Sequence, residues 1–203
     1  MKKGLTEIIF ILDRSGSMHP VVNDTIGGFN ATIEKQKELD GECLVSTVLF
    51  NNYSKVLHDR VNLKNISNLT TKDYEVSGCT ALLDAIGDAI HHIKNVHKYI
   101  REEDKPEKTM FIITTDGMEN ASRKYSYNDI KKLINEKQKI GWEFIFLGAN
   151  INAYEEGSKF GISNDRVCEY VQNSEGVTKQ YSRMNKAIHQ MRCNGEVNDS
   201  WKD

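Results

Sequence analysis

Apolar residues recur along the chain in two alternating patterns, which predict strands and helices in turn. Short continuous apolar runs are typical of strands buried on both faces of a sheet, whereas apolar residues spaced by three and four mark one face of a helix. The runs predict strands at about residues 7–12, 43–50, 109–115, 142–147 and 166–171. The spaced positions predict helices at about residues 21–39, 81–100, 126–141, 152–161 and 174–193.

Residues 53–58 are predicted to form one further strand, because the turn-forming pair Asn51-Asn52 would reverse the chain after the second strand. This strand would pair antiparallel with the one before it, as a hairpin. Residues 59–79 are polar and irregular, with a short helix near 62–69. The regular alternation of strands and helices favours an α/β fold with a mostly parallel sheet.

Length, charge and cysteine spacing narrow the class of protein. A chain of 203 residues suits one domain, which we expect to cover residues 1–203 with a core at about 5–193 and a loose polar tail at 194–203. The net charge of −2 and the absence of a long basic block give no reason to expect nucleic acid as a partner. The four cysteines form no C-x-x-C pair, so neither a zinc ribbon nor a redox motif is expected.

Hydropathy also bears on the location of the protein. No apolar stretch approaches the roughly 18 residues of a membrane span, and the run Ile8–Leu12 is too short for the core of a signal peptide. We therefore expect a cytoplasmic protein with no membrane partner.

Side chains with oxygen donors follow two predicted strands and precede one predicted helix. Asp13, Ser15 and Ser17 form a D-x-S-x-S pattern directly after the first strand. Thr80 opens a long helix, and Asp116 follows another strand. Ligands of open parallel sheets bind beyond the carboxyl ends of the strands, and hard oxygen donors suit Mg²⁺, Mn²⁺ or Ca²⁺. The sequence therefore predicts one divalent-metal site, formed by Asp13, Ser15, Ser17, Thr80 and Asp116.

The predicted donor set favours binding over catalysis. Two carboxylates neutralise the formal charge of a dication, while the hydroxyls are neutral and weak donors, so the metal stays electrophilic. Five side chains leave at least one of six coordination positions open. Such a centre suits capture of a partner's Asp or Glu carboxylate better than activation of water, because the motifs supply no evident general base. We expect no catalytic residues and no cofactor besides the metal.

At these residues the chain resembles the von Willebrand factor type A (vWA) domain family. That family carries a metal-ion-dependent adhesion site (MIDAS) with the pattern D-x-S-x-S, then a Thr, then an Asp after the fourth strand. Here the pattern stands as Asp13-Arg14-Ser15-Gly16-Ser17, Gly78-Cys79-Thr80 and Thr115-Asp116-Gly117, so all five positions match. The resemblance covers roughly residues 5–170.

The resemblance implies a doubly wound, Rossmann-like three-layer sandwich. Its six-stranded sheet would be mostly parallel with one antiparallel edge strand, in the order 3-2-1-4-5-6. It also implies direct coordination of the metal by Ser15 and Ser17. Asp13, Thr80 and Asp116 would exchange between direct and water-mediated contact as a ligand binds.

The context of the site differs from that of many animal members, which are secreted or membrane-anchored. This chain resembles the free-standing cytoplasmic versions found in bacteria and their phages, so adhesion to matrix is not carried over. The sequence predicts a Mg²⁺-dependent protein-binding module, with Mn²⁺ or Ca²⁺ as alternative ions.

Two other functions stay open on the sequence. The first is a metal-dependent phosphohydrolase, which would also place an Asp after the first strand. The haloacid-dehalogenase type needs D-x-D, but Ser15 stands where the second Asp would act as general acid, and no G-x-S-x-G motif is present. The second is a scaffold whose metal is purely structural.

Residues near the motifs have more ordinary interpretations. His91, His92 and His97 include no pair spaced by four, so we interpret them as surface residues. Asp84 is interpreted as a negative charge that complements a helix N-terminus, with a contact to Thr80 as the alternative.

Three further features of the sequence each have an expected place in the structure. Asn120 and Arg123 lie just beyond Asp116, where they would reach a partner at the rim of the site. The segment Phe146–Asn150 is interpreted as packing at a strand end. Gly27-Gly28 marks a close approach of the first helix to the sheet.

Overall fold

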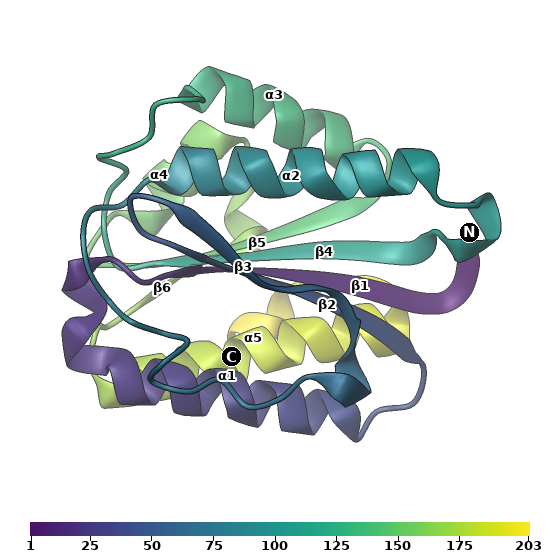
Figure 1. Ribbon diagram of the computed structural model, residues 1–203, viewed down its shortest axis with the longest axis horizontal. Helices are drawn as coiled ribbons and strands as arrows, with labels where there is room; N and C mark the ends of the chain where they lie inside the picture. The colour runs from purple at the N-terminus through teal and green to yellow at the C-terminus, as the bar shows by residue number, and fades with distance from the viewer.

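Six strands form one sheet in the computed structural model, which describes residues 1–203 (Figure 1). The strand order is β3-β2-β1-β4-β5-β6, and every neighbouring pair is parallel except β2 with β3. This architecture confirms the predicted fold class, strand order and antiparallel edge strand. The strands are β1 Lys2–Asp13, β2 Glu42–Phe50, β3 Ser54–Asn62, β4 Pro106–Thr115, β5 Trp142–Ala149 and β6 Val167–Tyr170.

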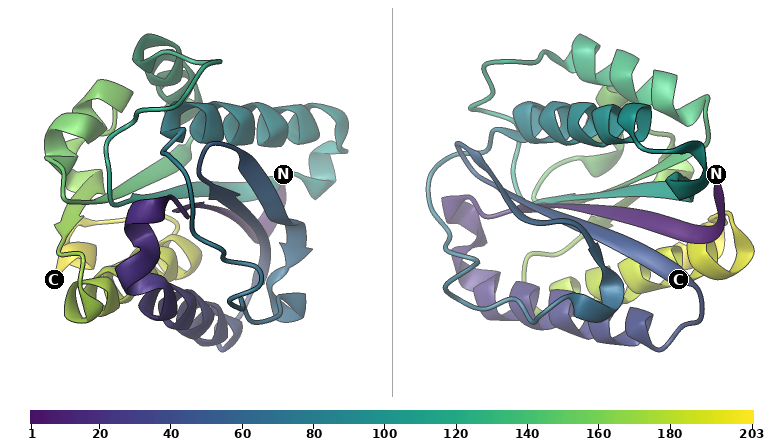
Figure 2. Two further views of the ribbon diagram at one scale, coloured as in Figure 1. Left: turned by 60° about the vertical axis from the view of Figure 1, so that its left-hand side comes forward. Right: turned by 45° about the vertical axis from the view of Figure 1, so that its right-hand side comes forward.

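Five α-helices cover the two faces of the sheet, which gives three layers. Figure 1 shows α1 and α5 on one face and α2, α3 and α4 on the other, and both views in Figure 2 keep α1 and α5 side by side. The helices are α1 Val22–Lys37, α2 Leu82–Tyr99, α3 Tyr127–Gln138, α4 Ala153–Phe160 and α5 Ser174–Asn194. None of them has the length and hydropathy needed to cross a membrane.

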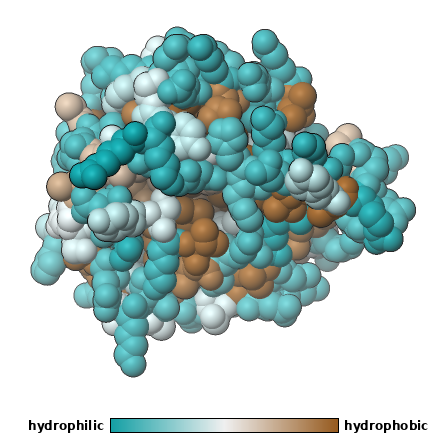
Figure 3. Space-filling view, turned by 45° about the horizontal axis from the view of Figure 1, so that its top comes forward, coloured by the Kyte–Doolittle hydropathy of each residue, from teal (hydrophilic) through white to brown (hydrophobic).

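The central strands are apolar on both faces because each face packs under helices. In β1, Ile8 and Phe10 belong to the core beneath α1 and α5, whereas Ile9 and Ile11 belong to the core beneath α2 and α3. All four side chains are at most 1% exposed. This double burial explains why the strand is a continuous apolar run rather than an alternating one. The outer surface over α2 and α3 is mostly hydrophilic, with small separate hydrophobic patches (Figure 3).

The strand order changes direction between β1 and β4. From β1 the chain continues through α1 to β2 on one side, and after α2 it enters β4 on the other side. The carboxyl ends of β1 and β4 therefore flank the crevice where doubly wound sheets bind ligands. β1 ends at Asp13, and its Leu12 lies opposite Thr114 of β4, so the segments after both strands emerge side by side.

Several predicted boundaries are close to those observed. Ser126 forms a capping box with Asp129 at the start of α3, and Asn152 caps α4, which ends at Gly161 with φ of 80°. Other boundaries differ. A 3₁₀ helix at Gly16–Val21, containing Pro20, was not expected, and α1 follows it at Val22, one residue after the expected start, and ends at Lys37 rather than near residue 39. The short helix expected near 62–69 is a single 3₁₀ turn at Leu63–Asn65, since β3 extends to Asn62.

The expectation of a loose polar tail is wrong. Residues 199–202 form a 3₁₀ helix, and Val197 and Trp201 are buried in the core beneath α5. The indole Nε1 of Trp201 donates to the carbonyl oxygen of Asp165 at 3.0 Å. The core therefore extends beyond residue 193. That the chain is one domain over residues 1–203 stays a prediction.

Two interpretations of helix residues are also wrong. The Gly27-Gly28 pair does not approach the sheet. A side-chain carbon at Gly28 would lie 2.2 Å from the ring of Tyr181, so this glycine allows α1 to pack closely against α5. His97 is not a surface residue, because its side chain is only 15% exposed and lies 2.6 Å from the buried carboxylate of Glu7.

Candidate metal site

The loop after β1 is organised around the carboxylate of Asp13. The backbone N–H of Ser15 donates to Asp13 Oδ1 at 2.7 Å, and the hydroxyl of Thr115 donates to Asp13 Oδ2 at 2.7 Å. Asp13 and Ser15 are each only 1% exposed, whereas Ser17 is exposed. The site therefore opens to solvent on the side of Ser17.

Asp116 joins this loop from the end of β4. The hydroxyl of Ser17 donates to Asp116 Oδ1 at 2.7 Å, and the hydroxyl oxygens of Ser15 and Ser17 are 3.0 Å apart. Asp116 is 2% exposed. The structure thus brings four of the five predicted ligands into one chain of polar contacts.

Thr80 lies beside this chain of contacts rather than within it. No hydrogen bond joins its hydroxyl to the other four side chains, but a side-chain carbon at Gly117 would lie 3.7 Å from Thr80 Oγ1. Asn120 fixes the backbone of Thr80 on both sides: Asn120 Oδ1 accepts from the Thr80 N–H at 2.9 Å, and the Asn120 N–H donates to the Thr80 carbonyl oxygen at 3.0 Å. The Thr80 hydroxyl is therefore held next to the turn that follows Asp116.

Backbone hydrogen bonds fasten the segment before Thr80 to the loop after β1. The Gly16 N–H donates to the Gly78 carbonyl oxygen, and the Ser77 N–H donates to the Arg14 carbonyl oxygen, each at 3.0 Å. Gly78 has φ of +75°, and a side-chain carbon there would lie 2.0 Å from Asn52 Oδ1. Only glycine fits that position without strain or collision.

Two buried tyrosines support the carbonyl groups beside the ligands. The hydroxyl of Tyr74 donates to the Asp13 carbonyl oxygen, and that of Tyr170 donates to the Thr115 carbonyl oxygen at 3.4 Å. Burial raises the pKa of both phenols well above their ordinary value. Both hydroxyls therefore stay protonated and available as donors.

The site holds two carboxyl groups whose ionised forms are disfavoured. Burial raises the pKa of Asp13 to about 6; hydrogen bonds from Thr115 and Ser15 lower it in part, and the charge of Asp116 raises it further. Burial also raises the pKa of Asp116, against hydrogen bonds from Ser17 and Gln172. Neither carboxylate forms a salt bridge with a Lys, Arg or His side chain.

These residues fit a hard divalent cation. Two carboxylates and three hydroxyls are all oxygen donors, the ligand type of Mg²⁺, Mn²⁺ and Ca²⁺. Their two negative charges are buried without a cationic partner, which is costly unless a cation offsets them. The structure contains no group of three or more His, Cys, Asp or Glu side chains placed to share a metal ion. Hydroxyl oxygens are therefore needed to complete this donor set.

Gln172 is a residue of the site that the motifs did not identify. It follows β6, and its amide Nε2 donates to the Ser17 carbonyl oxygen at 2.7 Å and to Asp116 Oδ2. Its amide oxygen accepts from Asn150 Nδ2, so Asn150 does more than pack at a strand end. The rule that ligands gather at the carboxyl ends of parallel strands applies to Gln172 as it does to Asp13, and could have pointed to it.

Asp84 has a role that neither sequence interpretation described. Its carboxylate accepts from the backbone N–H groups of Arg123 and Lys124, each at 2.9 Å, and of Tyr125 at 3.2 Å. It thereby fastens the loop after Asp116 to the start of α2. The side chain of Asn120 accepts from the Thr80 N–H, yet Asn120 is exposed and lines, with the exposed Arg123, a groove next to Thr80.

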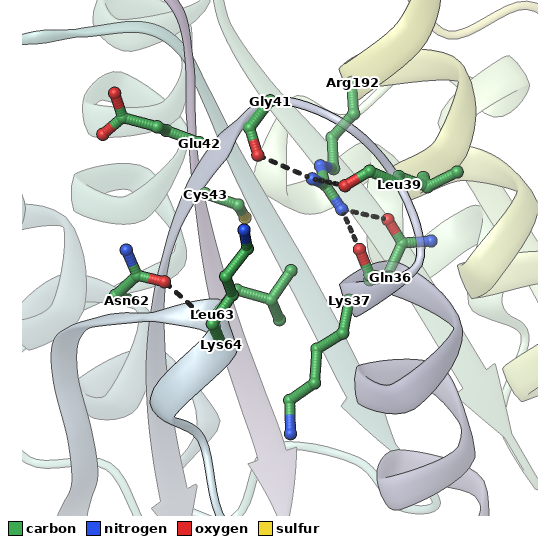
Figure 4. A pocket seen from close by; sticks show the side chains of 10 residues that line it. All are labelled: Gln36, Lys37, Leu39, Gly41, Glu42, Cys43, Asn62, Leu63, Lys64 and Arg192. Carbon is green, nitrogen blue, oxygen red and sulfur yellow. Dashed lines mark hydrogen bonds between the residues drawn. The ribbon is translucent and has the colours of Figure 1, made fainter.

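Another cavity, of about 310 Å³, lies at the opposite end of the sheet, between the end of α1 and the start of β2 (Figure 4). Arg192 enters it and donates to the carbonyl oxygen of Gln36, in the last turn of α1, and to that of Leu39, just after the helix. The first of these bonds satisfies a helix-end carbonyl. The guanidinium therefore has a structural use, and this cavity is not part of the candidate site.

Neither protein-family models nor curated protein sequences match this chain. Solved structures match it by shape. The vWF domain of the type V pili tip protein Mfa5 from Porphyromonas gingivalis covers 96% of this chain and 98% of its own, with a TM-score of 0.67 and 9% identity. The chain has the von Willebrand factor type A fold.

Two other matching structures carry metals. Proximal thread matrix protein 1 from the mussel byssus, solved with zinc in its MIDAS motif, is 14% identical, covers 90% of this chain and 45% of its own, and has a TM-score of 0.60. Manganese-loaded TRAP from Plasmodium vivax is 17% identical, covers 89% and 74%, and has a TM-score of 0.58. This chain spans less than half of the mussel chain, and at these identities the likeness concerns the fold.

Proposed function

We propose that this protein is a divalent-metal-dependent protein-binding module. A cation held by the site captures the carboxylate of an Asp or Glu residue on a protein partner. The ligands are Asp13, Ser15, Ser17, Thr80 and Asp116. The observation that carries the proposal is the pair of buried carboxylates, Asp13 and Asp116, linked through the Ser15 N–H and the hydroxyls of Ser15 and Ser17 and left without any cationic side chain.

The bound metal would supply a Lewis-acidic centre that attracts an anionic oxygen. The chain's own residues prepare its place. The hydroxyl of Thr115 and the N–H of Ser15 fix the Asp13 carboxylate at both oxygens, and Asn120 fixes Thr80. The exposed Ser17 leaves one side open, and a partner would approach from there.

A groove beside the site offers room for the partner's neighbouring residues. It has a volume of about 660 Å³ and lies next to Thr80, between Cys79, Asn120 and the exposed residues Tyr53 and Arg123. Met118, which is 64% exposed, follows Asp116 by two residues. Exposed aromatic and apolar side chains around a polar centre are common at protein interfaces.

We propose Mg²⁺ as the ion, with Mn²⁺ or Ca²⁺ as alternatives. All three prefer the oxygen donors present here. The mussel and Plasmodium proteins hold zinc and manganese, which supports a divalent ion at the corresponding place. We propose binding rather than catalysis, because both carboxylates are committed to holding the ion and no further titratable side chain contacts them. A cytoplasmic location stays a prediction.

The test has two arms. The first measures Mg²⁺ and Mn²⁺ binding to the metal-free chain by calorimetry, with Asp13→Ala as the site variant and Asp40→Ala, at an exposed position, as the matched control. Wild type and Asp40→Ala should bind one ion, and Asp13→Ala none. The absence of any binding by wild type would refute the proposal.

The second arm concerns the partner. Proteins retained from the native cell in Mg²⁺ and released by EDTA are identified, and candidate Asp and Glu residues in the best of them are changed to Asn or Gln. One such neutral substitution should abolish the metal-dependent binding. Equal affinity in Mg²⁺ and in EDTA, or wild-type affinity in Asp13→Ala, would contradict carboxylate capture.

A further inference from the structure

The side chain of Gln172 lies against the metal site, although 56 positions separate it from Asp116. Its two amide hydrogens go to the Ser17 carbonyl oxygen, at 2.7 Å, and to Asp116 Oδ2. Both partners only accept hydrogen bonds, so the amide nitrogen faces the site and the amide oxygen faces away. There the oxygen accepts from Asn150 Nδ2. One amide therefore connects the loop after β1, the end of β4 and the end of β5.

This contact completes the fixation of the Asp116 carboxylate. Ser17 donates to Oδ1 and Gln172 donates to Oδ2, so the group cannot turn without losing a charge-assisted hydrogen bond. A carboxylate that is free to rotate must be ordered when a cation binds, and that ordering weakens binding. A carboxylate already held in place avoids this loss, as with the outer partners of other metal ligands.

The amide of Gln172 is itself held from two sides. Its neighbour Asn173 caps α5, with Asn173 Oδ1 accepting from the Gly176 N–H at 2.8 Å, so the backbone next to Gln172 is fixed. Its amide oxygen is fixed by Asn150, which has φ of +55°. That left-handed conformation is uncommon for residues other than glycine, and Asn tolerates it best.

We propose that Gln172 is a positioning residue of the metal site: it orders Asp116 and the Ser17 loop before the cation arrives, and so raises the affinity for divalent cations. The inference rests on the proposed metal binding. Gln172 acts through Asp116 and Ser17 and has no contact with the ion assigned to it.

The experiment titrates Mn²⁺ alone into the full chain, freed of metal, by calorimetry. Gln172→Met keeps the length of the side chain and removes both donors, while Gln138→Met, at the end of α3, makes the same exchange far from the site. Gln172→Met should weaken Mn²⁺ binding about tenfold, the lower end of the effect of outer partners on metal ligands, and Gln138→Met should leave it unchanged. Equal or tighter binding by Gln172→Met would overturn the inference.

A second variant and a second readout separate positioning from general stability. Thermal unfolding of the metal-free variants reports their stability. If Gln172 had a merely structural role, Gln172→Met would lower the stability without changing the Mn²⁺ affinity of the folded chain. Asn150→Gly keeps the positive φ and removes the donor to Gln172, so it should weaken Mn²⁺ binding by about threefold, with little further loss in combination with Gln172→Met. If the losses of Mn²⁺ affinity from Asn150→Gly and Gln172→Met were additive in the double variant, the two residues would not act through one contact.

The Mn²⁺ titrations distinguish a failure of the proposed metal binding from a failure of the proposed role of Gln172. A wild-type chain that binds no Mn²⁺ would remove both the metal-dependent function and the role of Gln172. A wild-type chain that binds Mn²⁺ while Gln172→Met binds it equally well would remove only the role of Gln172.

Discussion

Asn120 and Thr80 form a reciprocal pair: the Asn120 side chain accepts from the Thr80 N–H at 2.9 Å, and the Asn120 N–H donates to the Thr80 carbonyl oxygen at 3.0 Å. Through this pair, the loop after β4 fixes Thr80, two residues before α2 begins at Leu82. Thr80 is the one predicted ligand without a hydrogen bond to the others, so its place in the site depends on Asn120.

Asn120→Ala should therefore weaken divalent-metal binding while the chain stays folded. The N–H of Thr80 loses its acceptor, so only the backbone bond from residue 120 to the Thr80 carbonyl oxygen still holds Thr80, and its hydroxyl is less firmly placed. We expect a loss of about tenfold in Mn²⁺ affinity by calorimetry, as for other outer partners of metal ligands. Arg123→Ala, also at an exposed position in the same loop but without a bond to Thr80, is the control. Equal affinities for Asn120→Ala and wild type would show that Thr80 needs no such support.

Asp13→Asn should stabilise the metal-free protein at neutral pH while abolishing metal binding. Burial raises the pKa of Asp13 from 3.8 to about 6 in the folded state, so the folded protein binds the proton more tightly than the unfolded chain does. The stability of the metal-free wild type should therefore fall as pH rises from about 4 to about 6. At pH 7 the deficit is roughly 2 to 3 kcal/mol.

The measurement is urea unfolding in the absence of metal between pH 4 and 7. Asparagine still offers an acceptor to the Ser15 N–H, so the loop is preserved while the charge is removed. Asp13→Asn should lack the fall in stability, and Asp40→Asn, at an exposed position, should keep it. A parallel pH dependence in wild type and Asp13→Asn would argue against an unfavourable buried charge at this position.

Glu7 holds a buried polar cluster at the other end of the molecule. Its carboxylate is 0% exposed and accepts from Arg60 Nε and His97 Nε2. Glu7→Ala leaves two largely buried donors without an acceptor, so we expect a destabilisation of about 3 to 5 kcal/mol in chemical denaturation. Glu107→Ala, at an exposed position on β4, is the control. A change below about 1 kcal/mol for Glu7→Ala would mean that water replaces the lost carboxylate.

Trp201→Ala tests the unexpected burial of the chain end. The indole is 0% exposed and donates to the Asp165 carbonyl oxygen. We expect a loss of about 3 to 5 kcal/mol in unfolding free energy, the range for removing a buried Trp or Phe. Glu196→Ala, at an exposed position in the same segment, should change stability by less than about 0.5 kcal/mol. A Trp201→Ala value equal to that of Glu196→Ala would contradict the packing.

The fold could be predicted because its signals are local and repeated. The apolar run Ile8–Leu12 marks a doubly buried strand within five residues. Asp13 and Asp116 could be placed together because each directly follows a parallel strand, and such strands end at one edge of a sheet. The D-x-S-x-S pattern then identified Ser15 and Ser17 as candidate ligands.

Residues outside any local motif were not predicted. Gln172 is a single polar residue that follows the four-residue strand β6. No motif around it indicates a contact with Asp116, which lies 56 positions earlier. His97 looked like a surface residue because its partner Glu7 is 90 positions away. Trp201 stands among polar residues with no helical spacing around it. In each case the deciding contact is long-range, and it exists only once the sheet and helices are packed.

The hydroxyls of Tyr74 and Tyr170 reach the proposed metal loops from the layer that contains α1 and α5. The hydrophobic core of that layer also contains Trp201, so the last turn of the chain packs on the same core as the two tyrosines beside the metal loops. Shortening the carboxyl terminus, or attaching a bulky fusion to it, should therefore disturb ion uptake at the far end of the sheet. Extensions at the amino terminus avoid this layer.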